Sequence, residues 1–257
     1  MRLHFAAFIA GALALGAFLA PIGATAADEF SPAQKKELAA FVKDYLINNP
    51  DVLRQAIDAL DKHDKEVAEA ARQKIVDDQA GALFSSNFQA TVGNLKGTAT
   101  LVEFFDYNCH YCKGALPDIA RLKQDDPDLK VVLKDFPVLG PDSVEAAKVA
   151  SAARNQLPGD RFWQFHNRLL AMHGPVGKTE ALAVARDLGL DMDRLGKDME
   201  SPDVANAMHE VMGMADSLQI NGTPTFVVGQ EVVVGAVGYD QLKQKIDAVH
   251  KCGHSVC

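Results

Sequence analysis

The amino-acid sequence predicts a mixed α/β domain that carries an all-helical insertion and follows a helical arm. Residues 98–105 and 129–138 are apolar runs of strand type, and the stretch between them, after Cys112, reads as helix. This order implies a parallel pair of strands joined by a crossover. Residues 142–217 carry a helical pattern broken by glycines and a proline. Residues 31–85 read as almost pure helix.

The first 26 residues have the pattern of a cleaved export signal. A basic start with Arg2 precedes an apolar run over 5–20, and Ala24-Thr25-Ala26 fits a signal peptidase site. The alternative is an uncleaved membrane anchor, which needs roughly 20 apolar residues. The run is shorter than that, so we expect a periplasmic protein without a membrane anchor, in a compartment where disulfides persist.

The length and charge of the chain limit its domain count and the partners that it can bind. Removing 26 of 257 residues leaves 231, enough for one domain with an appendage. The formal charge of −8 becomes −9 without Arg2. Such an acidic chain has no electrostatic basis for binding nucleic acid or anionic lipid. No segment after the signal is long and apolar enough to span a membrane.

Residues 27–85 form the predicted arm. Ser31-Pro32 followed by Gln34 is a helix start with a capping box, and Asn49-Pro50 ends that first helix. A second helix is expected from Asp51 to about Gln79. The arm is either packed on its own domain or an oligomerisation segment, and we expect self-association through it. Apolar residues recur at helical or heptad-like spacing in both helices: Leu38, Phe41, Val42, Tyr45, Leu46, Leu53, Ile57, Leu60, Val67 and Ala71.

The expected catalytic domain spans 90–250. Beyond the helical insertion, Thr225–Val228 and Val232–Val234 read as two strands joined by a Gly229-Gln230 turn, which predicts a hairpin. A last helix over Tyr239–His250 closes the domain, and residues 251–257 form a cysteine-containing tail.

Cys109 and Cys112 are separated by two residues and directly follow a strand. A structural zinc site needs four ligands, and the remaining cysteines, Cys252 and Cys257, lie far away in the tail. A purely structural disulfide between residues three apart closes almost no loop. We therefore favour a reactive dithiol over a metal clip or a crosslink.

This spacing lets both cysteines sit in the first turn of a helix, with Cys109 at its N-terminus. Free N–H groups and the positive end of the helix dipole stabilise a thiolate there. Cys109 is thus expected to attack, and Cys112 to resolve the mixed disulfide. The redox-active pair is Cys109–Cys112.

These residues resemble the thioredoxin superfamily, in particular the exported DsbA-like thiol–disulfide oxidoreductases, over roughly 90–250. Glu103 stands six residues before Cys109, where the family carries a buried acid that moves the proton of the resolving cysteine. Thr223-Pro224 matches the family's cis-proline loop, whose backbone docks substrate. The resemblance implies a thioredoxin fold with the inserted helical domain. From the residues alone, Glu103 can also be an edge acid and Pro224 a trans turn proline.

The arm is similar to that of the ScsC-like (copper-sensitivity suppressor) branch, whose members oligomerise, act as isomerases or serve a reducing membrane protein. Thr223 before the proline and Tyr111 between the cysteines are typical of isomerases. His110 departs from the usual Gly or Pro and either favours the thiolate or is a plain surface residue. We assign Thr223, Pro224, His110 and Tyr111 to substrate binding.

Two further groups leave alternatives open. His209 lies among methionines, a soft-ligand set that suits Cu(I), although helical methionines are more often core. In the tail, Cys252 and Cys257 form a local disulfide, a small metal site with His250 and His254, or a free thiol pair. We expect the disulfide, and we assign no metal and no cofactor.

The sequence therefore predicts a periplasmic enzyme that exchanges disulfides with protein substrates. We expect isomerase or reductase activity, a membrane redox partner, homo-oligomerisation and a link to copper tolerance. One alternative is a DsbA-like net dithiol oxidase. The other, from another class, is a Cu(I)-binding protein that uses Cys109 and Cys112 as ligands.

Overall fold

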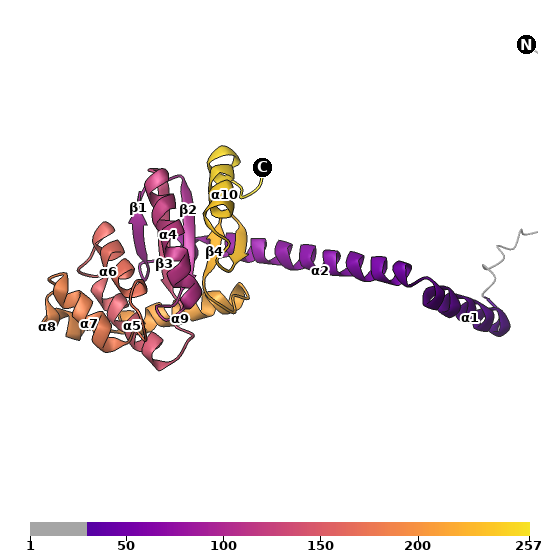
Figure 1. The fold of residues 1–257 in the computed structure, drawn as a ribbon, viewed down its shortest axis with the longest axis horizontal. Helices are drawn as coiled ribbons and strands as arrows, with labels where there is room; N and C mark the ends of the chain where they lie inside the picture. The colour runs from indigo at the N-terminus through magenta and orange to yellow at the C-terminus, as the bar shows by residue number, and fades with distance from the viewer. Residues whose placement is uncertain (1–29) are drawn as a thin grey trace, which may run out of the picture. The chain divides into compact units, whose positions relative to one another are not determined.

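The computed structural model describes residues 30–257, so the predicted export signal lies outside the described residues. The chain divides into two compact units, the first ending at Leu60 and the second comprising Asp61–Cys257 (Figure 1). The second unit begins earlier than the predicted end of the arm at residue 85. Residues 61–85 therefore pack with the mixed domain.

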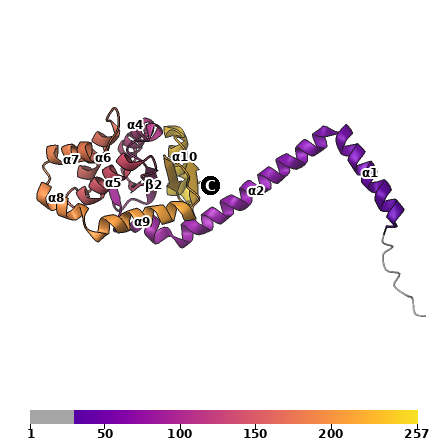
Figure 2. The same cartoon turned by 90° about the horizontal axis from the view of Figure 1, so that it is seen from below.

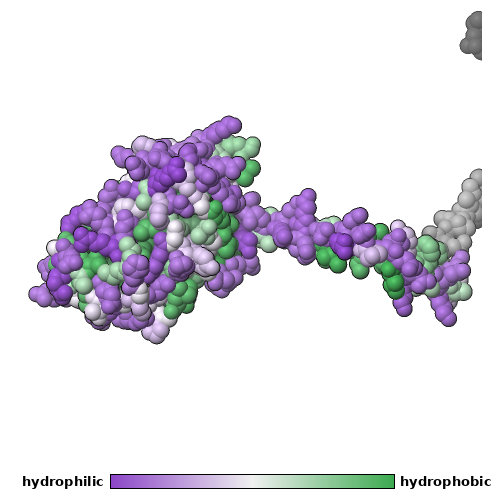
Figure 3. Space-filling model, in the orientation of Figure 1, coloured by the Kyte–Doolittle hydropathy of each residue, from purple (hydrophilic) through white to green (hydrophobic). Residues whose placement is uncertain are grey.

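The first unit consists of α1 (Pro32–Asn48) and the beginning of α2 (Pro50–Asp78). The predicted capping box is present, because the Gln34 amide donates to Ser31 Oγ and the Gln34 side chain accepts from the Ser31 amide. No residue of α1 is buried. Hydrophobic side chains gather along this segment in Figure 3, and the large exposed ones are Leu38, Phe41, Val42, Tyr45, Ile47, Val52, Leu53, Ile57 and Leu60.

A five-stranded sheet in the order β1-β3-β2-β4-β5 forms the centre of the second unit. The central strands β2 and β3 run parallel, as predicted, and the other neighbours pair antiparallel. The hairpin predicted around Gly229-Gln230 joins the last two strands. The strands are β1 (Ala90–Gly93), β2 (Ala99–Phe105), β3 (Leu129–Asp135), β4 (Thr225–Val228) and β5 (Glu231–Val234).

Helices cover both faces of the sheet (Figure 2). The crossover helix α4 (His110–Asp125) and the last helix α10 (Tyr239–Cys252) pack on the face that carries Leu101 and Phe105. The opposite face, with Val102 and Phe104, packs against α3 (Ala80–Ser85), α9 (Pro202–Ser217) and the end of α2. Val76 and Leu83 are buried there, which explains why residues 61–85 belong to this unit.

The predicted helical insertion consists of α5 (Pro141–Ala153), α6 (Asp160–Leu170), α7 (Lys178–Asp187), α8 (Met192–Met199) and α9. Gly159 caps the N-terminus of α6 with a φ of 56°, a value that favours glycine, and Pro202 opens α9. The insertion connects β3 to β4, so its first loop lies beside the C-terminal ends of the parallel strands.

Two elements differ from the sequence prediction. β3 ends at Asp135 rather than Val138, because the amides of Val138 and Leu139 donate to the Asp106 carboxylate and not to a strand. The short edge strand β1 was not predicted. Within residues 30–257, no helix is long and apolar enough to cross a membrane.

Candidate active site

Cys109 is the N-cap residue of α4, so its sulfur takes the place of a capping oxygen. The Cys112 amide donates to Cys109 Sγ over 3.3 Å. Both cysteines are free thiols, and Cys109 is 4% exposed while Cys112 is fully buried. The predicted placement of the pair in the first helical turn is confirmed, with the outer sulfur at the positive end of the helix.

The surroundings shift the pKa values of the two thiols in opposite directions. A hydrogen bond from the Cys112 side chain, helped by the Thr223 side chain and by the amides of Cys112 and Tyr111, lowers the pKa of Cys109 to about 6. The same contact with Cys109, together with burial, raises the pKa of Cys112. Cys109 is therefore a thiolate at neutral pH and Cys112 holds its proton.

Glu103 lies in the middle of β2 and is completely buried. Neither of its carboxylate oxygens has a hydrogen-bond partner. Burial, and secondarily the charge of Cys109, raise the pKa of Glu103 to about 8. The charge of Glu103 also raises the pKa of Cys112, which places the two groups within electrostatic reach of each other. The edge-acid alternative for Glu103 is wrong, because the side chain lies in the core.

The loop before β4 brings Thr223 and Pro224 to the cysteine pair. The peptide bond between them is cis, as predicted. The carbonyl oxygen of Thr223 lies 3.1 Å from Cys109 Sγ, where the protonated thiol donates to it. Antiparallel pairing of β4 with β2 fixes this loop next to the start of α4.

His110 and Tyr111 form the outer surface beside Cys109. Tyr111 is 67% exposed, and His110 is also exposed, with its ring 5.8 Å from the tyrosine ring. Val138 and Leu139 are exposed in the loop after β3, at 40% and 55%. These side chains give the region around the reactive sulfur an apolar character.

Sequence reasoning missed Asp106, which organises this region. Its buried carboxylate accepts four hydrogen bonds, from the amides of Asn108, Val138 and Leu139 and from the Ser143 hydroxyl, at 2.7–3.0 Å. The loop before Cys109 and the loop after β3 are thereby tied to one group. The available signal was the Asp106-Tyr107-Asn108 sequence, since Asp commonly bonds the backbone two residues on.

The tail lies at the other end of β2. Cys252 and Cys257 are joined by a disulfide. His250 bonds Asp126 over 2.8 Å and the hydroxyl of Thr98, the residue before β2, over 2.9 Å. His254 bonds Gln230, away from His250. The structure does not bring the tail cysteines to Cys109.

The methionines near His209 differ in their exposure. Met214 is 3% exposed, whereas Met212, two residues earlier on α9, is 45% exposed. Across the part of the chain that the structure describes, no group of three or more His, Cys, Asp or Glu side chains is placed to hold a metal ion.

Comparison with known proteins shows which families and solved structures the chain resembles. The DSBA-like thioredoxin domain matches residues 100–247, and the N-terminal domain of the copper resistance protein ScsC matches residues 34–66. A thioredoxin-like oxidoreductase from Silicibacter pomeroyi is 39% identical over 67% of this chain and 98% of its own, with a TM-score of 0.63. Proteus mirabilis ScsC in a transitional conformation is 28% identical over 85% of this chain and 98% of its own, with a TM-score of 0.63.

Curated relatives include an Na⁺/H⁺ antiporter NhaA from Salinispora arenicola, 33% identical over 53% of this chain. The chain spans only 21% of that antiporter's length. Disulfide bond formation protein D of Bacillus subtilis is 26% identical over 62% of this chain and 76% of its own length.

A thioredoxin fold with a capped Cys-X-X-Cys pair defines a thiol–disulfide oxidoreductase, and the chain belongs to the DSBA-like thioredoxin family. Its similarity to ScsC extends from this domain into the N-terminal helices.

Proposed function

We propose that the protein is an exported, periplasmic disulfide isomerase or reductase that acts on protein substrates. The observation that carries the proposal is the exposed apolar face of α1 and early α2, in a chain that also carries a DsbA-like catalytic unit. Such a face suits self-association, and an oligomer presents several thiolates to one misfolded substrate. The apolar surface of Tyr111, Val138 and Leu139 suits unfolded segments of that substrate.

The reaction begins when the Cys109 thiolate attacks a substrate disulfide and forms a mixed disulfide, with one substrate sulfur released as thiolate. In isomerisation, another substrate thiolate attacks the mixed disulfide and regenerates Cys109. In reduction, Cys112 loses its proton to Glu103 and attacks Cys109 Sγ, which frees the substrate. The Thr223-Pro224 backbone docks the substrate chain, and His110 and Tyr111 contact it. No metal or cofactor takes part.

The remaining roles follow from the family and the ScsC match. Residues 27–85 include the oligomerisation arm, 90–250 the DSBA-like domain with its insertion at about 142–217, and 251–257 the tail. A membrane redox partner keeps the Cys109–Cys112 pair reduced. The description of the matched arm family as a copper resistance protein supports a role in copper tolerance.

The test is the refolding of scrambled ribonuclease by the full chain and by the double variant Phe41→Glu with Ile57→Glu. Both residues are exposed, so the catalytic unit keeps its fold. We expect the variant to dissociate in light scattering and to lose isomerase activity. The control variant, Ala40→Glu with Gln55→Glu, adds the same charge to exposed positions that lie off the apolar faces. It should change neither the oligomeric state nor the isomerase activity. Activity that survives dissociation contradicts the oligomeric isomerase, and activity that survives Cys109→Ser contradicts the whole mechanism.

A DsbA-like net oxidase is the second candidate, and the lowered pKa of Cys109 favours it. A stabilised thiolate favours the reduced form, which makes the disulfide more oxidising. A potential near about −120 mV, with activity only toward reduced substrate, would support this candidate, whereas an isomerase lies nearer about −200 mV. The Cu(I)-binding alternative requires both thiolates, and the raised pKa of the buried Cys112 opposes that.

A further inference from the structure

Three ionisable side chains on the active-site face of the sheet are buried without any hydrogen-bond partner. They are Glu103, Tyr107 and Asp135, and the unpartnered atoms include all four carboxylate oxygens and the tyrosine hydroxyl. Parts of Asp135 reach the surface, yet both of its oxygens are buried. Burial raises the pKa of each group and so favours its neutral form, and the pKa of Glu103 lies at about 8. Buried polar groups are normally paired, so a cluster without partners calls for an explanation.

The strand register places these groups next to one another. Glu103 pairs with Leu133 and Phe105 with Asp135 across the parallel strands β2 and β3, so all four side chains lie on one face. Glu103 and Asp135 are diagonal neighbours, about 8 Å apart at Cα from the strand spacing and rise. The ring of Tyr107 lies 5.0 Å from that of Phe105. The charges of both Asp135 and Glu103 affect Tyr107, so it is close to both.

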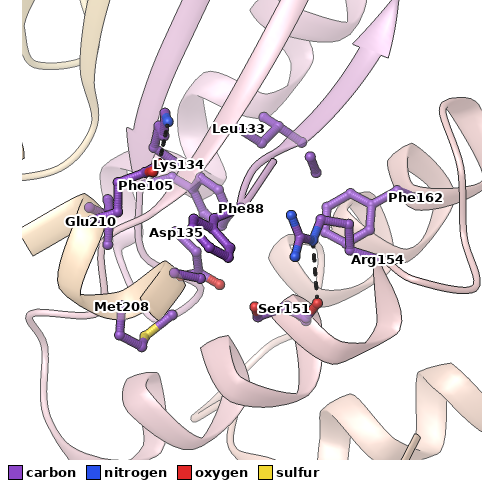
Figure 4. A pocket seen from close by; sticks show the side chains of 14 residues that line it. Phe88, Phe105, Leu133, Lys134, Asp135, Ser151, Arg154, Phe162, Met208 and Glu210 are labelled. Atoms are coloured by element: carbon purple, nitrogen blue, oxygen red, sulfur yellow. Dashed lines mark hydrogen bonds and ion pairs between the residues drawn. The ribbon is translucent and has the colours of Figure 1, made fainter. Parts of the chain in front are cut away.

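Asp135 also lines a cavity between the sheet and the helical insertion. Figure 4 shows its carboxyl directed into this pocket, with Ser151 and Arg154 on the other side. The volume of the cavity is about 30 Å³. A single buried water needs roughly 10–15 Å³, so the space suits about two waters. The lining includes Ala90, the first residue of the edge strand β1, and its partner Leu133 in β3.

Glu103 needs a route of this kind. It is completely sealed from solvent, and it is protonated at neutral pH while Cys109 is a thiolate. To accept the proton of Cys112 it must first release its own. Cys112 is buried as well, and the charges of both Glu103 and Asp135 raise the pKa of Tyr107, which makes Tyr107 a candidate link from Glu103 to Asp135.

We propose that Tyr107 and Asp135 relay protons between Glu103 and water in the cavity lined by Ser151 and Arg154. The proposal rests on the function proposed above, because it serves the deprotonation of Cys112. Asp135 gives its proton to cavity water and takes one from Glu103 across the Tyr107 hydroxyl, with water or side-chain rotation bridging the gaps between these groups. Glu103 then accepts the proton of Cys112, whose thiolate attacks Cys109 Sγ. The electron pair of the mixed disulfide leaves with the substrate sulfur, which is protonated by solvent. The reverse sequence serves oxidation.

The other charged groups around Asp135 form their hydrogen bonds with other residues. Lys134 bonds the Ala82 carbonyl and Glu210, and Arg154 bonds the carbonyls of Asn87 and Gln89. The Asp106 charge raises the pKa of Asp135 further and is itself satisfied by four donors. On the α6 side, burial lowers the pKa of His166 to about 3, so it is neutral. Among residues 30–257 no cation pairs with Asp135, which leaves it free to exchange protons with water.

The experiment measures the two chemical steps separately. Reduced protein is mixed with oxidised glutathione between pH 5 and 9, quenched with acid, and the Cys109–glutathione mixed disulfide is followed by mass spectrometry. Alkylation of Cys109 by iodoacetamide reports the first nucleophile alone. In Asp135→Asn we expect unchanged alkylation but a resolution step slowed about a hundredfold at pH 7, the lower end of what a proton-transfer group contributes. Tyr107→Phe should slow the same step.

A matched control and a spectroscopic readout keep the result interpretable. Asp187→Asn removes an exposed carboxyl at the end of α7 and should resolve the mixed disulfide at the wild-type rate. Infrared spectra of the reduced protein should show a protonated carboxyl band that Asp135→Asn removes, and a second that Glu103→Gln removes. Wild-type resolution across the pH range in both Asp135→Asn and Tyr107→Phe would overturn the relay. It would leave the proposed function standing, which an active Cys109→Ser would overturn.

Discussion

At the residue scale, Asp106 shows how one carboxylate positions a reactive cysteine. It is buried directly before the Cys109 segment and holds that segment to the loop that carries Val138 and Leu139. Hydrogen bonds to a buried charged group contribute more than neutral ones, and an orphaned donor adds a desolvation penalty. The apolar surface around Cys109 therefore depends on Asp106.

We predict that Asp106→Asn lowers the free energy of unfolding by about 2–4 kcal/mol, because an amide replaces one acceptor oxygen with a donor that faces other donors. Thermal and denaturant unfolding measure this, with Asp187→Asn as the exposed control. Disulfide exchange with a large protein substrate should fall more than exchange with glutathione. Equal losses for both substrates would show that Asp106 does not act through the surrounding loops.

The ionisation of Cys109 gives a second prediction. Its pKa in the folded protein is about 6, below that of an ordinary thiol. Alkylation of Cys109 should therefore rise through pH 6 and level off above it. Cys112→Ala should move this midpoint upward, because the Cys112 side chain is the largest contributor to the shift. A midpoint that stays at 6 in the variant would contradict this assignment.

The same shift makes the stability of the reduced protein depend on pH. A depressed pKa stabilises the folded state fully above the pKa of the unfolded thiol, and this contribution is lost as the pH falls through about 6. The difference in unfolding free energy between the reduced wild type and Cys109→Ser should therefore grow from pH 5 to pH 9. A flat difference, measured by denaturant titration at each pH, would refute it.

Glu103 acts on stability in the opposite direction. Its pKa in the folded state is raised to about 8, so its contribution to folding is lost as the pH rises from the unfolded carboxyl value through 8. Glu103→Gln should be more stable than wild type at pH 8 by on the order of 4 kcal/mol, while the two converge near pH 4. The variant should also resolve mixed disulfides slowly. A variant that is less stable than wild type at pH 8 would contradict the buried neutral acid.

At the scale of elements, local patterns predicted most of the fold. Helix caps, strand-like apolar runs and the Gly229-Gln230 turn are local signals, and the elements they indicate are present. The position of Cys109 at a helix start followed from its spacing to Cys112. The edge strand β1 was missed because four residues between polar turns carry too little periodicity.

The parts of the site that sequence could not give depend on pairing between distant segments. Asp106 bonds residues more than 30 positions away, and Asp135 reaches Glu103 only through the register of β2 and β3. In the sequence, Asp135 is one acid in a strand that ends near a proline. Its burial becomes apparent only when the helical insertion is packed over the strand end.

The element α10 with its tail offers another prediction. The Cys252–Cys257 disulfide closes a loop of a few residues. This loop follows α10, whose His250 bonds Thr98 at the N-terminal end of β2, whereas Cys109 follows the C-terminal end of that strand. Replacing both cysteines by serine should lower stability by at most about 2 kcal/mol, the loop-entropy estimate for so short a closure. Exchange activity should stay at the wild-type level. Loss of activity in the double variant, with the melting temperature unchanged, would show that the tail takes part in electron transfer.

At the scale of the whole molecule, the boundary between the units decides which truncation is informative. The second unit starts at Asp61 and includes two buried apolar residues from before the sheet, Val76 and Leu83. A chain of residues 61–257 keeps both, whereas one of 86–257 loses both. Fully burying such a side chain contributes about 1.5–3 kcal/mol, so their joint loss is comparable to a large part of a domain's stability.

We therefore predict that 61–257 is a monomer that unfolds with nearly the midpoint of the full chain, while 86–257 is destabilised by several kcal/mol or aggregates. Because the Cys109 site lies entirely within 61–257, this unit should oxidise small dithiols or reduce small disulfides at the full-chain rate. It should fail to refold scrambled ribonuclease, since the apolar faces of α1 and early α2 are absent. Light scattering, denaturant titration and both activity assays measure these outcomes. Full refolding activity from monomeric 61–257 would assign isomerisation to the catalytic unit alone and leave the arm without its proposed role.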